Sequence, residues 1–123
     1  MKTIQTLSIL FSITILLWSC SSSPPPPLEP GTPSLSFPLN EETCQEGTSL
    51  NDSQSSLEFR WSSAANVETY RLSVTNLNNN QRETLETTGT SLSVTLLKAT
   101  PYSWNITAIG EEGSQNANSP TWR

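Results

Sequence analysis

The sequence predicts an all-β domain, a two-sheet sandwich of seven short strands that follows a signal peptide and a proline-rich tether. Three observations lead to this fold class. Apolar and polar residues alternate with a period of two in five segments between residues 34 and 108. Turn-forming residues separate these segments, and no window carries the apolar stripe of an amphipathic helix. Period-two patterns with one polar face are typical of strands packed on one side, so two sheets should close over one core.

The five clear strands are defined by the apolar residues that we expect to face inward. Their aromatic members are predicted to lie in the core rather than to form an exposed surface for stacking sugars. The inward sets along the chain are Leu35 and Phe37; Leu57, Phe59 and Trp61; Tyr70, Leu72 and Val74; Leu92, Val94 and Leu96; and Tyr102, Trp104, Ile106 and Ala108.

Two weaker segments complete the seven strands. Residues 81–87 are polar on both faces, which predicts an edge strand. Residues 119–122 predict a last strand, whose Trp122 we expect to pack against the sandwich. The intervening turns are indicated by the asparagine-rich residues 76–81, which tolerate left-handed backbone, and by Gly and Pro further along the chain.

The first nineteen residues have the organisation of an export signal. Lys2 gives a positive start, and residues 4–18 form an apolar run broken only by small or polar residues. The run is shorter than the roughly 20 residues that a membrane span needs. Four prolines at 24–27 follow closely and cannot continue a helix. We therefore expect residues 1–19 to be a cleaved signal peptide.

Leu17, Ser19 and Cys20 sharpen that expectation. The segment resembles the lipobox of bacterial lipoproteins, with Leu three residues before Cys and a small residue directly before it. Trp18 departs from the pattern, where the family usually has a small residue. The resemblance implies cleavage before Cys20 and acylation of its thiol and new amino group. Two or more acyl chains would then anchor the protein stably in a membrane. The alternatives are a plain secretory signal with an incidental cysteine, or an uncleaved N-terminal anchor.

Residues 20–33 form the predicted linker between the lipidated Cys20 and the domain. Six of the nine prolines lie in this stretch. Consecutive prolines favour extended polyproline II at about 3.1 Å per residue, so the linker could hold the domain roughly 40 Å from a headgroup layer. A proline-rich ligand for a recognition module is the alternative role.

Charge and cysteine content limit the classes of partner. The chain has 6 basic and 11 acidic residues and a net charge of −5. This balance argues against nucleic acid and against electrostatic binding to anionic headgroups, so we expect the lipid on Cys20 to provide membrane attachment. Acylation of Cys20 would leave Cys44 single, and we expect Cys44 to be a small buried residue at the edge of the core, with an intermolecular disulfide as the alternative.

Residues 34–123 resemble a fibronectin type III domain, an immunoglobulin-like sandwich. Trp61 stands where that family has its core tryptophan, and residues 70–74 look like its third strand. The most specific part is Leu96-x-x-x-Thr100-x-Tyr102, similar to the segment that leads into the sixth strand of the family. The resemblance implies a tyrosine corner, in which the Tyr102 hydroxyl bonds to nearby backbone. Lys98 and Ala99 replace the usual Pro and Gly, and no Arg-Gly-Asp is present.

The sequence offers little that could support catalysis. It contains no histidine, so Ser-His-Asp and Cys-His arrangements and the usual zinc sites are excluded. The acidic doublets Glu41-Glu42 and Glu111-Glu112 stand beside loop residues, where solvated charge is the ordinary interpretation. We expect no enzyme activity, no cofactor and no metal. Binding residues are sought in the polar loops instead, at Asn78, Asn79, Asn80, Glu111 and Glu112.

The leading hypothesis is therefore a lipid-anchored protein of the bacterial cell envelope, expected in the outer membrane, that displays a non-catalytic binding or adhesion module. Its partner would be an envelope or extracellular protein or a glycan, and the sequence leaves open whether it faces the periplasm or the outside. The first alternative is a structural spacer or accessory subunit of an envelope complex. A fragment of a carbohydrate-processing protein is a further alternative.

Overall fold

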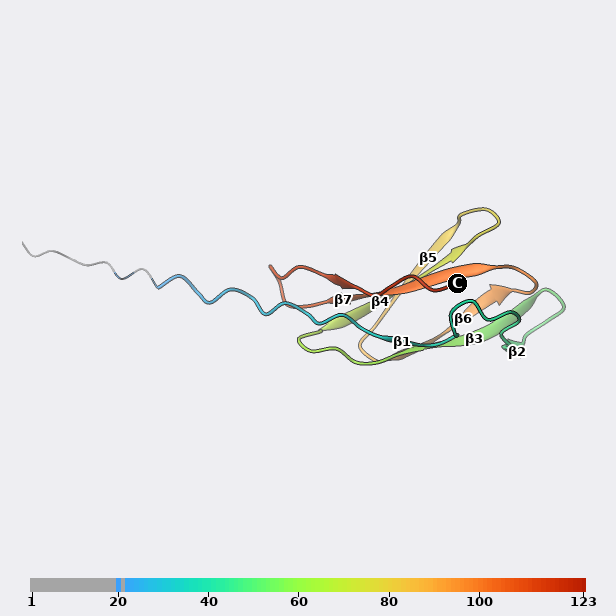
Figure 1. Ribbon diagram of the computed structural model, residues 1–123, viewed down its shortest axis with the longest axis horizontal. Coiled ribbons are helices and arrows are strands. Elements are labelled where there is room, and N and C mark those ends of the chain that lie inside the picture. Colours follow the sequence, from blue (N-terminus) through green and yellow to red (C-terminus); the bar gives the residue numbers. More distant parts are fainter. Residues whose placement is uncertain (1–19, 21) are drawn as a thin grey trace, which may run out of the picture.

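A computed structural model describes Cys20 and residues 22–123, so the predicted signal peptide at residues 1–19 lies outside the described residues. Eight strands form two antiparallel sheets that face each other (Figure 1). In the part of the chain that the structure describes, no helix has the length and apolar character needed to cross a membrane. The predicted all-β class with two sheets is confirmed.

Strand β3 (Gln54–Trp61) is the centre of the first sheet. Along one side it pairs with β6 (Ser91–Leu97), from Gln54 opposite Leu97 to Arg60 opposite Ser91. The short strands β1 (Leu35–Phe37) and β2 (Thr48–Ser49) pair with opposite ends of the other side of β3. The second sheet has the order β5 (Arg82–Thr87), β4 (Thr69–Asn76), β7 (Tyr102–Ile109) and β8 (Ala117–Asn118).

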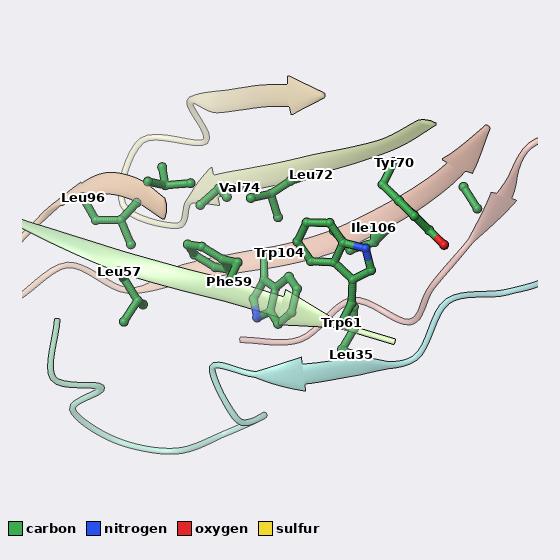
Figure 2. Packing of buried hydrophobic residues seen from close by; sticks show 12 residues of the cluster. Leu35, Leu57, Phe59, Trp61, Tyr70, Leu72, Val74, Leu96, Trp104 and Ile106 are labelled. Carbon is green, nitrogen blue, oxygen red and sulfur yellow. The ribbon is translucent and has the colours of Figure 1, made fainter. Parts of the chain in front are cut away.

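The core lies between the two sheets, as the alternation predicts. Phe59 of β3 meets Trp104 of β7 edge to face, with ring centroids 5.1 Å apart, so large aromatic side chains of the two sheets interlock. Figure 2 shows these residues converging from both sheets. The buried apolar set is Leu35, Leu57, Phe59, Trp61, Tyr70, Leu72, Val74, Val94, Leu96, Trp104, Ile106 and Ala108. Tyr102 is only half-buried, and Trp122 packs edge to face on Trp104, which confirms its predicted packing.

Of the two weaker strands predicted from the sequence, one is confirmed and the other is wrong in its bounds. The edge strand predicted at 81–87 is confirmed as β5 (Arg82–Thr87), which is one of the two outer strands of its sheet. The predicted strand at 119–122 is wrong in its bounds: β8 is Ala117–Asn118, and Trp122 returns to β7 as an isolated bridge to Trp104. The ladder breaks between them because the Ser119 hydroxyl accepts the N–H of Ile106 and Pro120 has no N–H to donate.

Two further differences concern residues 38–49. Strand β2 was not predicted, because it has two exposed residues and no apolar alternation. The expectation that Cys44 is buried is wrong: Cys44 is exposed, with a positive φ of 63°. It lies in the connection between β1 and β2 among Glu42, Gln45 and Glu46, whose polar side chains hold this segment at the surface.

Tyr102 forms the bond expected of a tyrosine corner, since its hydroxyl accepts the N–H of Leu97 at 3.0 Å. We predict that Tyr102→Phe lowers the free energy of unfolding by about 1 kcal/mol, the usual net contribution of one hydrogen bond. Urea denaturation measures the change, and amide exchange should accelerate selectively at Leu97. An unchanged midpoint together with unchanged Leu97 exchange would contradict a stabilising role for this bond.

Candidate functional site

The domain has two ends, which the strand register defines. One end holds loops 62–68 and 110–116, beside the pair Thr69–Ile109, where β4 begins and β7 ends. We call it the proximal end, because it contacts the tether. The distal end holds loops 50–53, 77–81 and 98–101, beside the pairs Asn76–Tyr102 and Gln54–Leu97. The two groups of loops are therefore separated by the full length of the strands.

The structure does not bring the predicted binding loops together. Asn78, Asn79 and Asn80 lie at the distal end, whereas Glu111 and Glu112 lie at the proximal end, and all five are exposed. They therefore cannot contribute to one small-ligand site, and each loop has to be judged by itself.

The distal asparagine loop is largely held by its own side chains. The Asn76 side-chain oxygen accepts the N–H of Asn78 at 2.9 Å, and the Asn79 side-chain oxygen accepts the N–H of Gln81 at 2.9 Å. Asn80 has a φ of 58° and donates its N–H to the Asn76 carbonyl. These contacts are typical of asparagine in tight turns, which accounts for the composition of the loop without a ligand.

At the proximal end, Glu111 and Glu29 hold the last part of the tether on the domain. Glu111 Oε1 accepts the N–H of Leu28 at 2.6 Å, and Glu29 Oε2 accepts the N–H of Gln115 at 2.8 Å. The Glu29 carbonyl also accepts the side-chain N–H of Asn66 at 3.1 Å. Glu111 thus has a structural partner in the chain itself. Glu29 was not predicted, although it is the single charged residue in 20–33.

The proline-rich tether is therefore docked over its second half. Gly31 donates its N–H to the Ala65 carbonyl at 2.9 Å, and Pro30 and Pro33 are buried. Packing of the folded unit thus extends N-terminally beyond the predicted boundary at residue 34. The part of the tether before these contacts runs away from the proximal end as an extended segment that leads back to Cys20 (Figure 1). Residues 22–26 would span roughly 15 Å in polyproline II, less than half of the reach predicted for the whole linker.

Gly110 permits the close approach of tether and domain, which leads to a test of the docking. A Cβ at this position would lie 2.6 Å from Ser114 Oγ, 3.0 Å from the Asn66 carbonyl oxygen and 3.1 Å from Pro30 Cδ. We predict that Gly110→Ala costs about 1–3 kcal/mol of stability through overpacking, and that it accelerates proteolytic cleavage between residues 27 and 32.

Gly89→Ala is the matched control for Gly110→Ala. A Cβ at Gly89 would meet only Thr87 Oγ1, at an ordinary 3.6 Å, so we expect no loss of stability and no change in cleavage of the tether. Equal effects of the two substitutions, measured by urea denaturation and by limited proteolysis followed by mass spectrometry, would contradict the docking.

Two of the open depressions on the described surface lie beside strands of the first sheet. One, of about 540 Å³, lies beside β1 and β3, where the Arg60 guanidinium stacks over the Phe37 ring at 5.0 Å from its centroid. The other, which we call the distal groove, has a volume of about 470 Å³. It lies between the start of β5 and the end of β6, and its lining includes Gln54, Val74, Arg82, Thr95, Leu96 and Tyr102.

Exposed leucines at the distal end were also not predicted as surface features. Leu50, Leu77 and Leu97 are 53%, 39% and 47% exposed, and all three lie at or beside the distal loops. A signal for one of them is present in the sequence: Leu97 directly follows Leu96, and neighbouring residues of a strand face opposite sides. The distal end thus combines apolar side chains with amide groups.

The described residues contain no group of three or more His, Cys, Asp or Glu side chains arranged to hold a metal ion. Comparison with known proteins gives no relative. No family model, no curated protein and no solved structure matches the chain. A function therefore has to be proposed from the residues and their arrangement.

Proposed function

We propose that this protein is a lipid-anchored lipoprotein of the bacterial cell envelope that displays a non-catalytic, fibronectin type III-like binding module. The observation that carries the proposal is the position of the tether. Cys20 is exposed at the far end of a segment that leaves the proximal end of the domain, and contacts of Leu28, Glu29 and Gly31 hold the root of that segment. An anchor on Cys20 would direct the distal end away from the membrane.

Three features support the fibronectin type III-like part of the proposal. The central strand β3 pairs with β1 and β6, and the second sheet has the order β5-β4-β7-β8. Trp61 is buried at the end of β3, where the resemblance expects the core tryptophan. The hydroxyl of Tyr102 returns to the backbone at Leu97. Folds of this kind serve many functions, so the binding activity rests on the surface and not on the fold.

The anchor is tested by metabolic labelling with palmitate. We predict that the wild-type chain incorporates label and partitions with membranes, whereas Cys20→Ser loses the label entirely, because it lacks the thiol that would be acylated. Cys44→Ser is the matched control, since Cys44 is the other cysteine and is also exposed, and it should label like wild type. Label that persists in Cys20→Ser, or is absent from wild type, would refute the anchor.

Protease treatment of intact cells then determines the side of the envelope. Cleavage of the labelled protein on intact cells would place the module on the outside, where external glycans and proteins are the partners to examine. Protection on intact cells with cleavage after permeabilisation would place it in the periplasm, among envelope complexes.

The second candidate is a spacer or accessory subunit without a ligand of its own. It is favoured by the asparagine loop, whose side chains bond within the loop itself. Two variants distinguish the spacer from binding by that loop: deletion of the whole domain, and replacement of residues 77–81 by a short glycine turn. If the deletion causes a phenotype and the loop replacement does not, the spacer is favoured.

A further inference from the structure

We propose that the outer edge of β6 is a docking site for an extended, non-acidic peptide segment of a partner protein, which would add to the sheet as a further strand. This inference deepens the proposed binding function, on which it rests, by naming the surface and the class of partner. Strand β6 leaves the backbone groups of its outer side unpaired among the described residues.

The pairing pattern identifies which groups of β6 point away from β3. Trp61 donates its N–H to the Thr90 carbonyl at 3.0 Å, and Lys98 donates to the Ser53 carbonyl at 2.9 Å. Hydrogen-bonded and non-hydrogen-bonded pairs alternate along an antiparallel ladder. Counting inward from these two bonds in the β3–β6 register, Leu92, Val94 and Leu96 direct their backbone groups toward β3. Ser91, Ser93 and Thr95 therefore direct theirs outward.

Leu97 provides an independent check of this assignment. Its N–H is bonded to the hydroxyl of Tyr102 rather than to β3, as expected for an outward residue. Tyr102 therefore caps the distal end of the edge and leaves Ser91–Thr95 as the open stretch. Within Cys20 and residues 22–123, β6 pairs only with β3.

The edge of β6 lacks the features that normally prevent pairing with another chain. Exposed edges are usually protected by charged residues or proline. The other outer strand that borders the distal groove, β5, fits this rule with Arg82, Glu83 and Glu86 in six residues. Strand β6 has the sequence SLSVTLL, with no charge and no proline, and it is rich in residues that favour strands. The two edges thus differ in a way that leaves β6 available.

The neighbouring groove indicates what side chains the added strand would carry. The distal groove is bordered by Thr95 and Leu96 of β6, has Val74 in its lining, and is flanked by Arg82 and Glu83 of β5. Alternate side chains of a strand laid along β6 would point toward this groove, which suits an apolar residue there. The net charge of −5 disfavours an acidic segment.

A second copy of the chain is a poorer occupant of this edge. Two copies anchored through Cys20 in the same membrane would both point their distal ends outward, so their β6 strands would run in the same direction. A twofold pairing of β6 with itself in the common antiparallel form would require one of the two domains to turn over relative to its anchor. A partner peptide carries no such restriction on its direction.

The test uses the full-length chain extracted in mild detergent and immobilised. The probe is a displayed library of peptides of about ten residues with Val, Ile, Leu or Phe at alternate positions. We expect enrichment of non-acidic members. A peptide enriched from the library is then synthesised and added to the wild-type protein. Amide exchange should show new protection at Ser93 and Thr95 and none at Thr84 on β5.

Ser93→Pro should weaken binding of that peptide by about tenfold or more, because it removes an outward N–H without removing a bond to β3. Ser93→Ala, which keeps the N–H, should bind within about twofold of wild type, and so should Thr84→Pro on the β5 edge. Circular dichroism checks that each variant is folded. If Ser93→Pro is unfolded, the exchange pattern of wild type decides alone.

Several results would overturn the inference, and they separate it from the proposed function. Absence of enriched peptides, protection confined to β5 or the loops, or undiminished binding by folded Ser93→Pro would each do so.

Other results would assign a different occupant or function. Self-association that protects Ser93 and Thr95 without peptide would assign the edge to a second copy. Binding on a glycan array without any peptide binding would refute the edge site while leaving a binding module. No binding to either would refute both in favour of the spacer, while the palmitate result stands separately.

Discussion

Trp61→Ala is expected to lower the free energy of unfolding by about 3–5 kcal/mol, the range for truncating a buried large aromatic residue. Trp61 is 4% exposed at the end of β3, and its ring packs edge to face on Tyr70 with centroids 5.8 Å apart. Figure 2 shows the indole projecting from β3 toward Tyr70 of the second sheet. The substitution would leave a cavity between the two sheets where the proximal end closes. Urea denaturation followed by circular dichroism measures the loss.

The indole N–H of Trp61 allows packing to be separated from hydrogen bonding. It is buried and has no acceptor among the described residues, so removing it sacrifices no hydrogen bond. We therefore expect Trp61→Phe to cost clearly less than Trp61→Ala, because most of the ring volume remains. Leu50→Ala, at an exposed position, serves as the control and should stay within about 0.5 kcal/mol of wild type. A change below about 1 kcal/mol for Trp61→Ala would contradict its place in the core.

Trp104→Ala should have a comparable effect, about 3–5 kcal/mol, for a different reason. Trp104 is 4% exposed at the centre of the sandwich and makes two edge-to-face contacts, with Phe59 of the first sheet and with Trp122 near the C-terminus. Its loss removes the contact that interlocks the sheets and also the surface on which Trp122 packs. Urea denaturation should show the loss, and near-ultraviolet circular dichroism should show the loss of aromatic coupling.

Trp122→Ala is the informative companion to Trp104→Ala. Trp122 is only half-buried, so its truncation should cost less than truncation of Trp104. The two tryptophans contact each other, so the double variant should be less destabilised than the sum of the two single changes. Strict additivity would show that the Trp104–Trp122 contact contributes nothing measurable.

The core of this protein was predictable from local pattern alone. In β3, β4, β6 and β7 the residues predicted to face inward alternate with polar residues, and all of them are buried or packed against the core. A strand places successive side chains on opposite faces, so burial of one face leaves its mark directly in the sequence. The edge position of β5 was predictable for the same reason, because a strand polar on both faces has no core face to bury.

Features without a periodic pattern could not be predicted. Strand β2 is two exposed residues held by pairing with β3, and β8 ends where the Ser119 side chain takes over the bond of Ile106. The error at Cys44 has the same origin. A cysteine in a polar connection is compatible with either burial or exposure until the path of the connection is known.

The functional surfaces also divide into features that the sequence predicts and features that it does not. The all-β class, the inward face of each long strand and the expectation of an anchor at Cys20 all follow from the amino-acid pattern, because each depends on residues close together in the chain. The docking of the tether by Glu29 and Glu111, the placement of the two predicted loops at opposite ends and the unprotected edge of β6 became known only from the folded arrangement. These features depend on contacts between residues distant in the chain, and an amino-acid pattern records the burial of a side chain far better than the identity of its neighbour.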